Sequence, residues 1–80
     1  MNPLLECCEQ NLAKGLDQVV NLPEIASRVD LVTYGCMNEC QTCAKMYYGF
    51  LEGEWVTGNT LVEFKTHLLE ALEHWEKENL

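Results

Sequence analysis

Apolar residues open the chain in one short, nearly continuous run. Residues 3–8, PLLECC, have the length of a β-strand, and such a run is typical of a strand buried on both faces. Asn11 follows at a position suited to a helix N-cap. Beyond it, apolar residues recur at the spacing of one helix face: Leu12, Leu16, Val19 and Val20. We therefore predict a strand and then a helix, which Gly15 weakens by about 1 kcal/mol relative to alanine. Pro23 ends this helix or begins one more turn.

A second strand is predicted over residues 29–35. The sequence VDLVTYG is rich in β-favouring residues and alternates between two faces, with Val29, Leu31 and Thr33 on one and Asp30, Val32 and Tyr34 on the other. Because this strand follows a strand and a helix, it completes a βαβ unit. Such crossovers are nearly always right-handed, so the first helix is expected on one face of a parallel strand pair.

The second half of the chain begins with a predicted hairpin and ends with a predicted helix. Residues 46–58 carry two β-favouring runs around Glu52 and Gly53, and glycine supplies the positive φ of a tight turn. Thr60 and Glu63 then match the S/T-x-x-E pattern of a capping box. The apolar positions of the following helix share one face: Leu61, Phe64, Leu68, Leu72 and Trp75.

The element order is therefore β-α-β-β-β-α. We expect an α/β protein with a four-stranded mixed sheet and two helices packed on it, which is a reduced thioredoxin-like fold. Residues 1–80 are expected to form a single domain, since domains commonly contain about 100 to 150 residues. The segment after the second strand would lie beside the carboxyl end of the first strand, where open α/β sheets place their chemistry.

Four cysteines are expected to meet at that edge of the sheet. Cys8 closes the first strand, whereas Cys36, Cys40 and Cys43 follow the second. Neighbouring strands lie about 4.8 Å apart, so thiols at their matching ends are within reach of one ion. Four thiolates suit tetrahedral zinc or an iron–sulfur cluster, although the spacing is not the C-x2-C…C-x2-C of a zinc ribbon. Ligand type alone does not separate zinc, iron–sulfur and Cu(I).

Cys7 is expected to play a different part. Adjacent side chains of a strand point to opposite faces, so Cys7 and Cys8 do not both face one site. We predict that Cys7 is a small buried apolar residue. It would be a substitute ligand if the strand ended early, and a strained vicinal disulfide with Cys8 is a rare alternative.

Thiol–disulfide exchange is the competing chemistry. Cys40 and Cys43 form a C-x-x-C pair, which suits a redox disulfide. In thioredoxins, however, the active pair lies at the N-terminus of the first helix, where the helix dipole lowers the thiol pKa. Here the pair lies in a later loop, and Glu39 beside Cys40 disfavours the thiolate.

Composition narrows the classes of partner. The chain has 13 acidic and five basic residues and a net charge of −8, so it lacks the positive charge that binds nucleic acid or an anionic membrane. Its N-terminus has no signal-peptide pattern, and no apolar run approaches the roughly 18 residues of a membrane span. We therefore expect a cytoplasmic protein, in which cysteines indicate metal binding or catalysis rather than a disulfide framework. No Ser/His/Asp set or phosphate-binding loop is present, so a non-enzymatic module is favoured.

The remaining polar and aromatic features are expected to be structural. His67 and His74, seven residues apart on the last helix, are interpreted as solvated surface residues. Five aromatic residues are attributed to packing, with the shielding of a cluster as the alternative: Tyr34, Tyr47, Tyr48, Phe50 and Trp55.

Three segments carry a resemblance to a known family. MNPLLECCEQNLAKG, VTYGCMNECQTCAKMYYGFLEGEWVTGNT and the acidic amphipathic tail resemble the YuzB-like family of small bacterial proteins of unknown function. This family is similar to a branch of the thioredoxin-like superfamily. The resemblance implies that its cysteines correspond to Cys8, Cys36, Cys40 and Cys43. Cys7 departs from the family pattern, in which an aromatic or aliphatic residue is usual.

Residues 36–60 are also similar to the second half of thioredoxin-like [2Fe-2S] ferredoxins. There, a C-x3-C pair precedes a hairpin with a glycine-containing turn and the final helix, and Cys36 and Cys40 match that pair. Cys8 matches the cluster cysteine after the first strand. Residues 9–30 contain no cysteine for the fourth position, for which Cys43 is the replacement that the chain offers.

Together these features lead to one functional hypothesis and two alternatives. We expect a redox or electron-transfer module that binds an iron–sulfur centre, for which the ferredoxin resemblance implies [2Fe-2S], through the four thiolates and acts with an unidentified redox partner protein. The alternatives are a metal-free thiol–disulfide redox protein that uses Cys40 and Cys43, and a zinc-binding interaction module.

Overall fold

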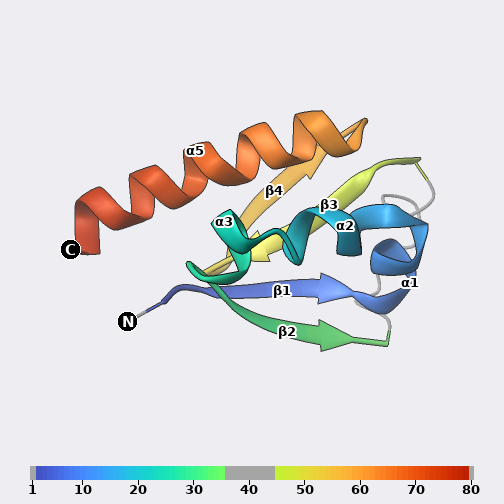
Figure 1. The fold of residues 1–80 in the computed structure, drawn as a ribbon, viewed down its shortest axis with the longest axis horizontal. Coiled ribbons are helices and arrows are strands. Elements are labelled where there is room, and N and C mark those ends of the chain that lie inside the picture. Colours follow the sequence, from blue (N-terminus) through green and yellow to red (C-terminus); the bar gives the residue numbers. More distant parts are fainter. Residues whose placement is uncertain (1, 36–44, 80) are drawn as a thin grey trace.

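The computed structural model describes residues 2–35 and 45–79 (Figure 1). In these residues the chain forms a four-stranded mixed sheet with helices, which confirms the predicted α/β class and the mixed sheet. The strands are β1 (Leu4–Cys8), β2 (Asp30–Tyr34), β3 (Tyr47–Leu51) and β4 (Glu54–Gly58). They pair in the order β2-β1-β3-β4, with β1 parallel to β2 and the other two pairs antiparallel.

The chain between β1 and β2 forms a kinked run of short helical pieces instead of the single helix predicted. Gly15 has a φ of 124°, a left-handed conformation that glycine adopts more readily than other residues, so the helix axis breaks there. Pro23 begins one more helical turn, which is one of the two outcomes predicted for it. The pieces are α1 (Glu9–Asn11), the π-helical η1 (Leu12–Leu16), α2 (Asp17–Val20) and α3 (Pro23–Ala26).

The hairpin and the last helix form as predicted. Glu52 and Gly53 have φ values of 50° and 86°, and two successive positive values are typical of the tight turn that joins twisted strands. Thr60 precedes α5 (Leu61–Asn79), and its Oγ1 accepts a hydrogen bond of 3.1 Å from the Glu63 amide. The Glu63 carboxylate accepts from the Asn59 amide instead of the Thr60 amide, so the capping box is closed one residue earlier than the standard pattern.

The helices cover one face of the sheet, and the main core lies between the two layers. Leu5 and Cys7 of β1, Leu51 of β3 and Val56 of β4 supply its sheet side. The helical side is supplied by Leu16, Val19, Val20, Ile25, Phe64, Leu68 and Leu72. On the opposite face Cys8 and Tyr48 form a small second cluster with Phe50, while Leu4 is 37% exposed. The prediction that β1 is buried on both faces is therefore correct only at its carboxyl end.

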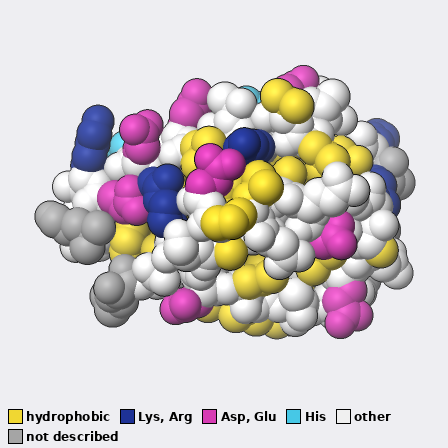
Figure 2. Space-filling model, viewed as in Figure 1, with side chains coloured by type: hydrophobic (Ala, Val, Ile, Leu, Met, Phe, Trp, Pro, Cys, Tyr) yellow, Lys and Arg dark blue, Asp and Glu magenta, His cyan; other side chains and the backbone are white. Residues whose placement is uncertain are grey.

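Charged side chains are spread over the surface of this two-layer structure. Figure 2 shows acidic side chains scattered between apolar ones on the face in view. Arg28 forms a two-pronged pair with Glu76, at 2.7 and 3.1 Å, which links the segment before β2 to α5. His67 and His74 are exposed, as expected, but both have contacts: His67 Nδ1 lies 2.5 Å from the Thr57 carbonyl oxygen, and His74 lies 3.5 Å from Glu78.

Gly58 gives the first test of this packing. It is buried where β4 meets the first turn of α5, and a β-carbon there would lie within 2.7 Å of the Phe64 Cα and closer still to the Phe64 amide nitrogen. We expect Gly58→Ala to lower the free energy of unfolding by about 2–3 kcal/mol, because backbone rather than a flexible side chain must move. Urea unfolding followed by circular dichroism measures this change.

Gly35→Ala is the matched control, since no atom of the described residues outside the immediate chain neighbours lies within 4 Å of a β-carbon at that position. Its unfolding free energy should change by less than about 1 kcal/mol. Equal effects of the two substitutions would contradict the close approach of β4 and α5.

Candidate cysteine site

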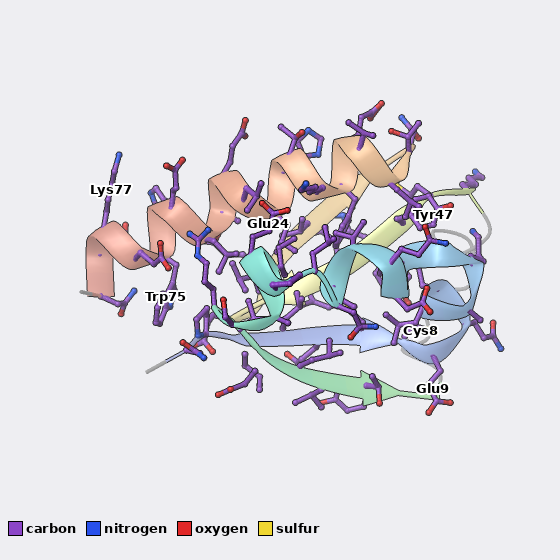
Figure 3. All side chains as sticks on the ribbon, in the orientation of Figure 1. Cys8, Glu9, Glu24, Tyr47, Trp75 and Lys77 are labelled. Carbon is purple, nitrogen blue, oxygen red and sulfur yellow. The ribbon has the colours of Figure 1, made fainter. Side chains whose placement is uncertain are left out.

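Cys8 stands at the carboxyl end of β1, where Figure 3 shows it at the junction with α1. In the parallel register it lies opposite Tyr34, the last residue of β2. The thiol is 3% exposed and donates a weak hydrogen bond of 3.8 Å to the carbonyl oxygen of Gly35. Cys8 therefore occupies the sheet edge that the sequence predicted for it, beside the residue that leads out of β2.

The other three predicted ligands, Cys36, Cys40 and Cys43, lie in residues 36–44, outside the described part of the chain. Residues on both sides of that segment are described, and both sides are tied to the neighbourhood of Cys8. Gly35 contacts the Cys8 thiol on the amino-terminal side. Met46 is held on the carboxyl-terminal side by a side chain of the helical run that begins directly after Cys8.

That side chain is Asn11, for which the prediction of a helix N-cap at the start of the helix is wrong. The helical run begins at Glu9, so Asn11 is the last residue of α1, has helical φ and ψ, and makes no side-chain cap hydrogen bond. Its side chain is fully buried. The amide nitrogen donates a 3.0 Å hydrogen bond to the Met46 carbonyl, and the amide oxygen accepts one of 3.1 Å from the Tyr48 backbone N–H. Asn11 thus clamps the start of β3 against the end of β1.

Cys7 has the structural role predicted for it. It is fully buried in the main core and faces the helices, whereas Cys8 lies on the other side of the sheet. Its thiol is free, so no vicinal disulfide with Cys8 forms. Because β1 continues through Cys8, the strand does not end early, which was the condition for Cys7 to act as a substitute ligand. Burial, and then the neighbouring Cys8, raises the pKa of the Cys7 thiol to about 12. Cys7 is therefore a protonated apolar side chain at neutral pH.

Aromatic side chains surround the Cys8 side of the sheet. Tyr48 is fully buried and stacks on Trp55 with 5.3 Å between ring centroids, and Phe50 meets Trp55 edge-on at 4.8 Å. Tyr34 is 42% exposed and donates a 2.8 Å hydrogen bond to the Glu6 carboxylate, which raises the pKa of Tyr34. These contacts agree with the predicted role of the aromatic residues in sheet packing.

A shallow cleft lies at the opposite end of the sheet. Its volume is about 100 Å³, and Trp75 of α5 forms part of its wall (Figure 3). Leu51 and Glu52 also line it, and Leu51 pairs with Leu5 near the start of β1, so the cleft is separated from Cys8 by the length of that strand. The other lining residues are Glu54, Ala71, His74 and Glu78. The cleft and the cysteine site are thus different features of the molecule.

Metal-binding clusters and membrane-spanning helices are both absent from the described residues. Residues 2–35 and 45–79 contain no group of three or more His, Cys, Asp or Glu side chains placed to hold a metal ion. None of the helices in the same residues has the length and apolar character required to cross a membrane. Among the described residues, Cys8 is therefore the feature on which a thiolate site would be built.

Asn11 provides a test of the frame around Cys8. Asn11→Ala should lower the free energy of unfolding by about 2 kcal/mol, because it leaves the Met46 carbonyl and the Tyr48 N–H without these partners in a buried region. Chemical denaturation measures the loss. Asn21→Ala, at an exposed position, is the control and should change stability by less than about 0.5 kcal/mol. Similar losses in both variants would show that Asn11 does not act as a clamp.

The raised pKa of Cys7 predicts a pH dependence of stability. The unfolded chain loses this proton near the ordinary value of 9.0, whereas the folded chain keeps it up to about 12. The contribution to stability is therefore complete below pH 9.0 and is lost as the pH rises towards 12. From about pH 8 to about pH 10 the wild type should lose about 1 kcal/mol more stability than Cys7→Ala, as measured by urea unfolding. Parallel pH profiles would contradict the assignment.

Comparison with known proteins identifies the family. Residues 1–75 match the family model described as "Protein of unknown function (DUF1450)". A UPF0349 protein of Shouchella clausii is 34% identical over 73 residues, which cover 91% of this chain and 94% of the relative. A UPF0349 protein of Staphylococcus epidermidis is 35% identical over 80 residues, covering 100% of this chain and 99% of the relative. No solved structure matches this chain. The chain therefore belongs to the DUF1450, or UPF0349, family of small bacterial proteins of unknown function.

Proposed function

We propose that this protein is a small redox or electron-transfer module that binds an iron–sulfur centre through the thiolates of Cys8, Cys36, Cys40 and Cys43. The observation that carries the proposal is the contact between the Cys8 thiol and the Gly35 carbonyl. Gly35 directly precedes the segment that holds the other three cysteines. Cys8, the proposed ligand that lies in the described residues, is thus next to the start of the segment that contains the other three cysteines.

The environment of Cys8 fits a metal ligand. The side chain is 3% exposed and packs beside Tyr48, in a cluster separate from the main core. As a ligand, Cys8 would lose the proton that it donates to Gly35, and its buried thiolate would then require a nearby positive charge, which a bound iron ion would supply. The aromatic side chains beside it would limit access of water, which is one of the factors that set the reduction potential of a cluster.

The frame around Cys8 also supports a preorganised site. Asn11 holds the carbonyl of Met46, so the return of the chain into β3 lies near the same strand end as Cys8. A metal site gains affinity when its supporting structure is rigid before the metal binds. The mixed sheet, with its parallel β1–β2 pair, supports the thioredoxin-like part of the proposal, in which the cysteines lie at the carboxyl ends of these strands. An iron–sulfur centre bound there would supply one-electron redox chemistry.

Anaerobic purification followed by visible spectroscopy and analysis of iron, sulfide and zinc tests the proposal. We expect a brown protein with sulfur-to-iron charge-transfer absorption. Cys8→Ser should lose most of its iron and absorbance, because one of four ligands is replaced. Cys7→Ala is the matched control and should keep both, because Cys7 faces the main core on the other side of the sheet.

Each of the following results would contradict the proposal. Equal iron content in Cys8→Ser and Cys7→Ala would remove Cys8 from the ligand set. A colourless protein with one bound zinc ion would indicate the zinc-binding interaction module. A colourless, metal-free protein whose reaction with a disulfide substrate is slowed by Cys40→Ser would indicate thiol–disulfide exchange.

A further inference from the structure

The sheet face opposite the helices carries exposed apolar side chains. Strand alternation places Leu4 and Glu6 of β1 on this face, because Leu5 and Cys7 point into the main core. Tyr34 shares the face, since its hydroxyl binds the Glu6 carboxylate. The face is completed by Phe50 of β3 and Trp55 of β4, which are paired across the two strands. We call these five residues the open sheet face.

Exposure distinguishes this face from the rest of the described surface. Leu4, Tyr34 and Trp55 are 37%, 42% and 46% exposed. They are three of the five large apolar side chains that are exposed in the described residues, the others being Leu31 and Val62. Aromatic residues that remain exposed on a rigid sheet are typical anchors of protein interfaces. The open sheet face therefore has the composition of a docking surface.

Its aromatic residues are already held in position. Trp55 is stacked on the buried Tyr48 at 5.3 Å and meets Phe50 edge-on at 4.8 Å between centroids. The Tyr34 hydroxyl is fixed by its 2.8 Å hydrogen bond to Glu6. Binding to such side chains costs little conformational entropy, because few rotamers remain to be lost.

Charge identifies the kind of partner. On the side of the open sheet face the strands carry the acidic residues Glu6 and Asp30 but no lysine or arginine. Glu54, in contrast, alternates with Trp55 and lines the cleft beside α5. Two basic residues of the helical layer already form ion pairs, Arg28 with Glu76 and Lys65 with Glu24. A second copy of the chain would bring another net charge of −8 to the face, so self-association is opposed by repulsion. A basic partner is favoured by the same charge.

We propose that the open sheet face docks a partner protein with a basic surface, whose arginine or lysine side chains stack on Trp55 and Tyr34 and pair with Glu6. Cations bind to the faces of tryptophan and tyrosine rings, and a carboxylate beside the ring adds to the attraction. Cys8 ends the strand that carries Leu4 and Glu6 and lies on the same side of the sheet. A docked partner would therefore be next to the cysteine site, but the inference holds whatever the cysteines bind.

Titration of the full-length, isotope-labelled protein with a short peptide of alternating arginine and threonine tests this proposal by NMR. The largest shifts are expected at the Trp55 indole N–H and at the amides of Glu6 and Tyr34. Trp55→Ala should weaken binding about tenfold, as expected for an aromatic anchor. Glu6→Gln should weaken it about two- to fivefold, the range of an exposed ion pair. A peptide with glutamate in place of arginine should cause no saturable shifts.

Glu70→Gln is the matched control, because it removes the same charge from an exposed position of α5. Its binding should stay within about 1.5-fold of the wild type. Shifts centred on α5, or equal effects of Glu6→Gln and Glu70→Gln, would reduce the binding to general attraction and overturn the proposal. So would the absence of saturable shifts, or a dimer that Trp55→Ala dissociates, since a second copy would then cover the face. If Trp55→Ala fails to fold, the two glutamine variants decide.

Discussion

The side-chain amide of Asn11 joins the helical run after β1 to the first residues of β3 from a fully buried position. A buried amide must find hydrogen-bond partners, because the loss of its contacts with water is costly. Its partners here are backbone groups of Met46 and Tyr48, and both lie just beyond the cysteine-rich segment. This clamp holds the return of the chain into the sheet beside the carboxyl end of β1, where Cys8 lies.

The central strand β1 separates two environments within one molecule. Leu5 and Cys7 face the helices, and Cys7 stays protonated because burial raises its pKa to about 12. One residue further along, Cys8 faces the other side of the sheet and meets Gly35. Two adjacent cysteines thus lie in different environments because a strand alternates its side chains between faces. The same alternation leaves Glu6, between Leu5 and Cys7, on the open sheet face.

The one-sided placement of the helices explains the surface of the protein. The helical pieces and α5 share the core with the sheet face that carries Leu5, Leu51 and Val56. The opposite face therefore keeps Trp55 and Tyr34 partly exposed, beside Cys8 and Tyr48, which are buried. The proposal of a basic partner rests on these exposed, fixed aromatic residues and on the acidic character of the chain. The proposed docking surface runs along β1 from Leu4 to Tyr34 of β2, which lies opposite Cys8, so it borders the proposed redox site.

Local patterns in the sequence determined the strands, the Glu52-Gly53 turn and the cap of α5, because each depends on residues within about one turn or strand of one another. The placement of Cys7 and Cys8 on opposite faces of the sheet also followed from strand alternation alone. Only the tertiary structure decided the role of Asn11, whose partners are 35 and 37 residues away. It also decided that the helix breaks at Gly15, where the chain packs near Leu61. These features depend on contacts between distant segments, which a pattern of neighbouring residues does not encode.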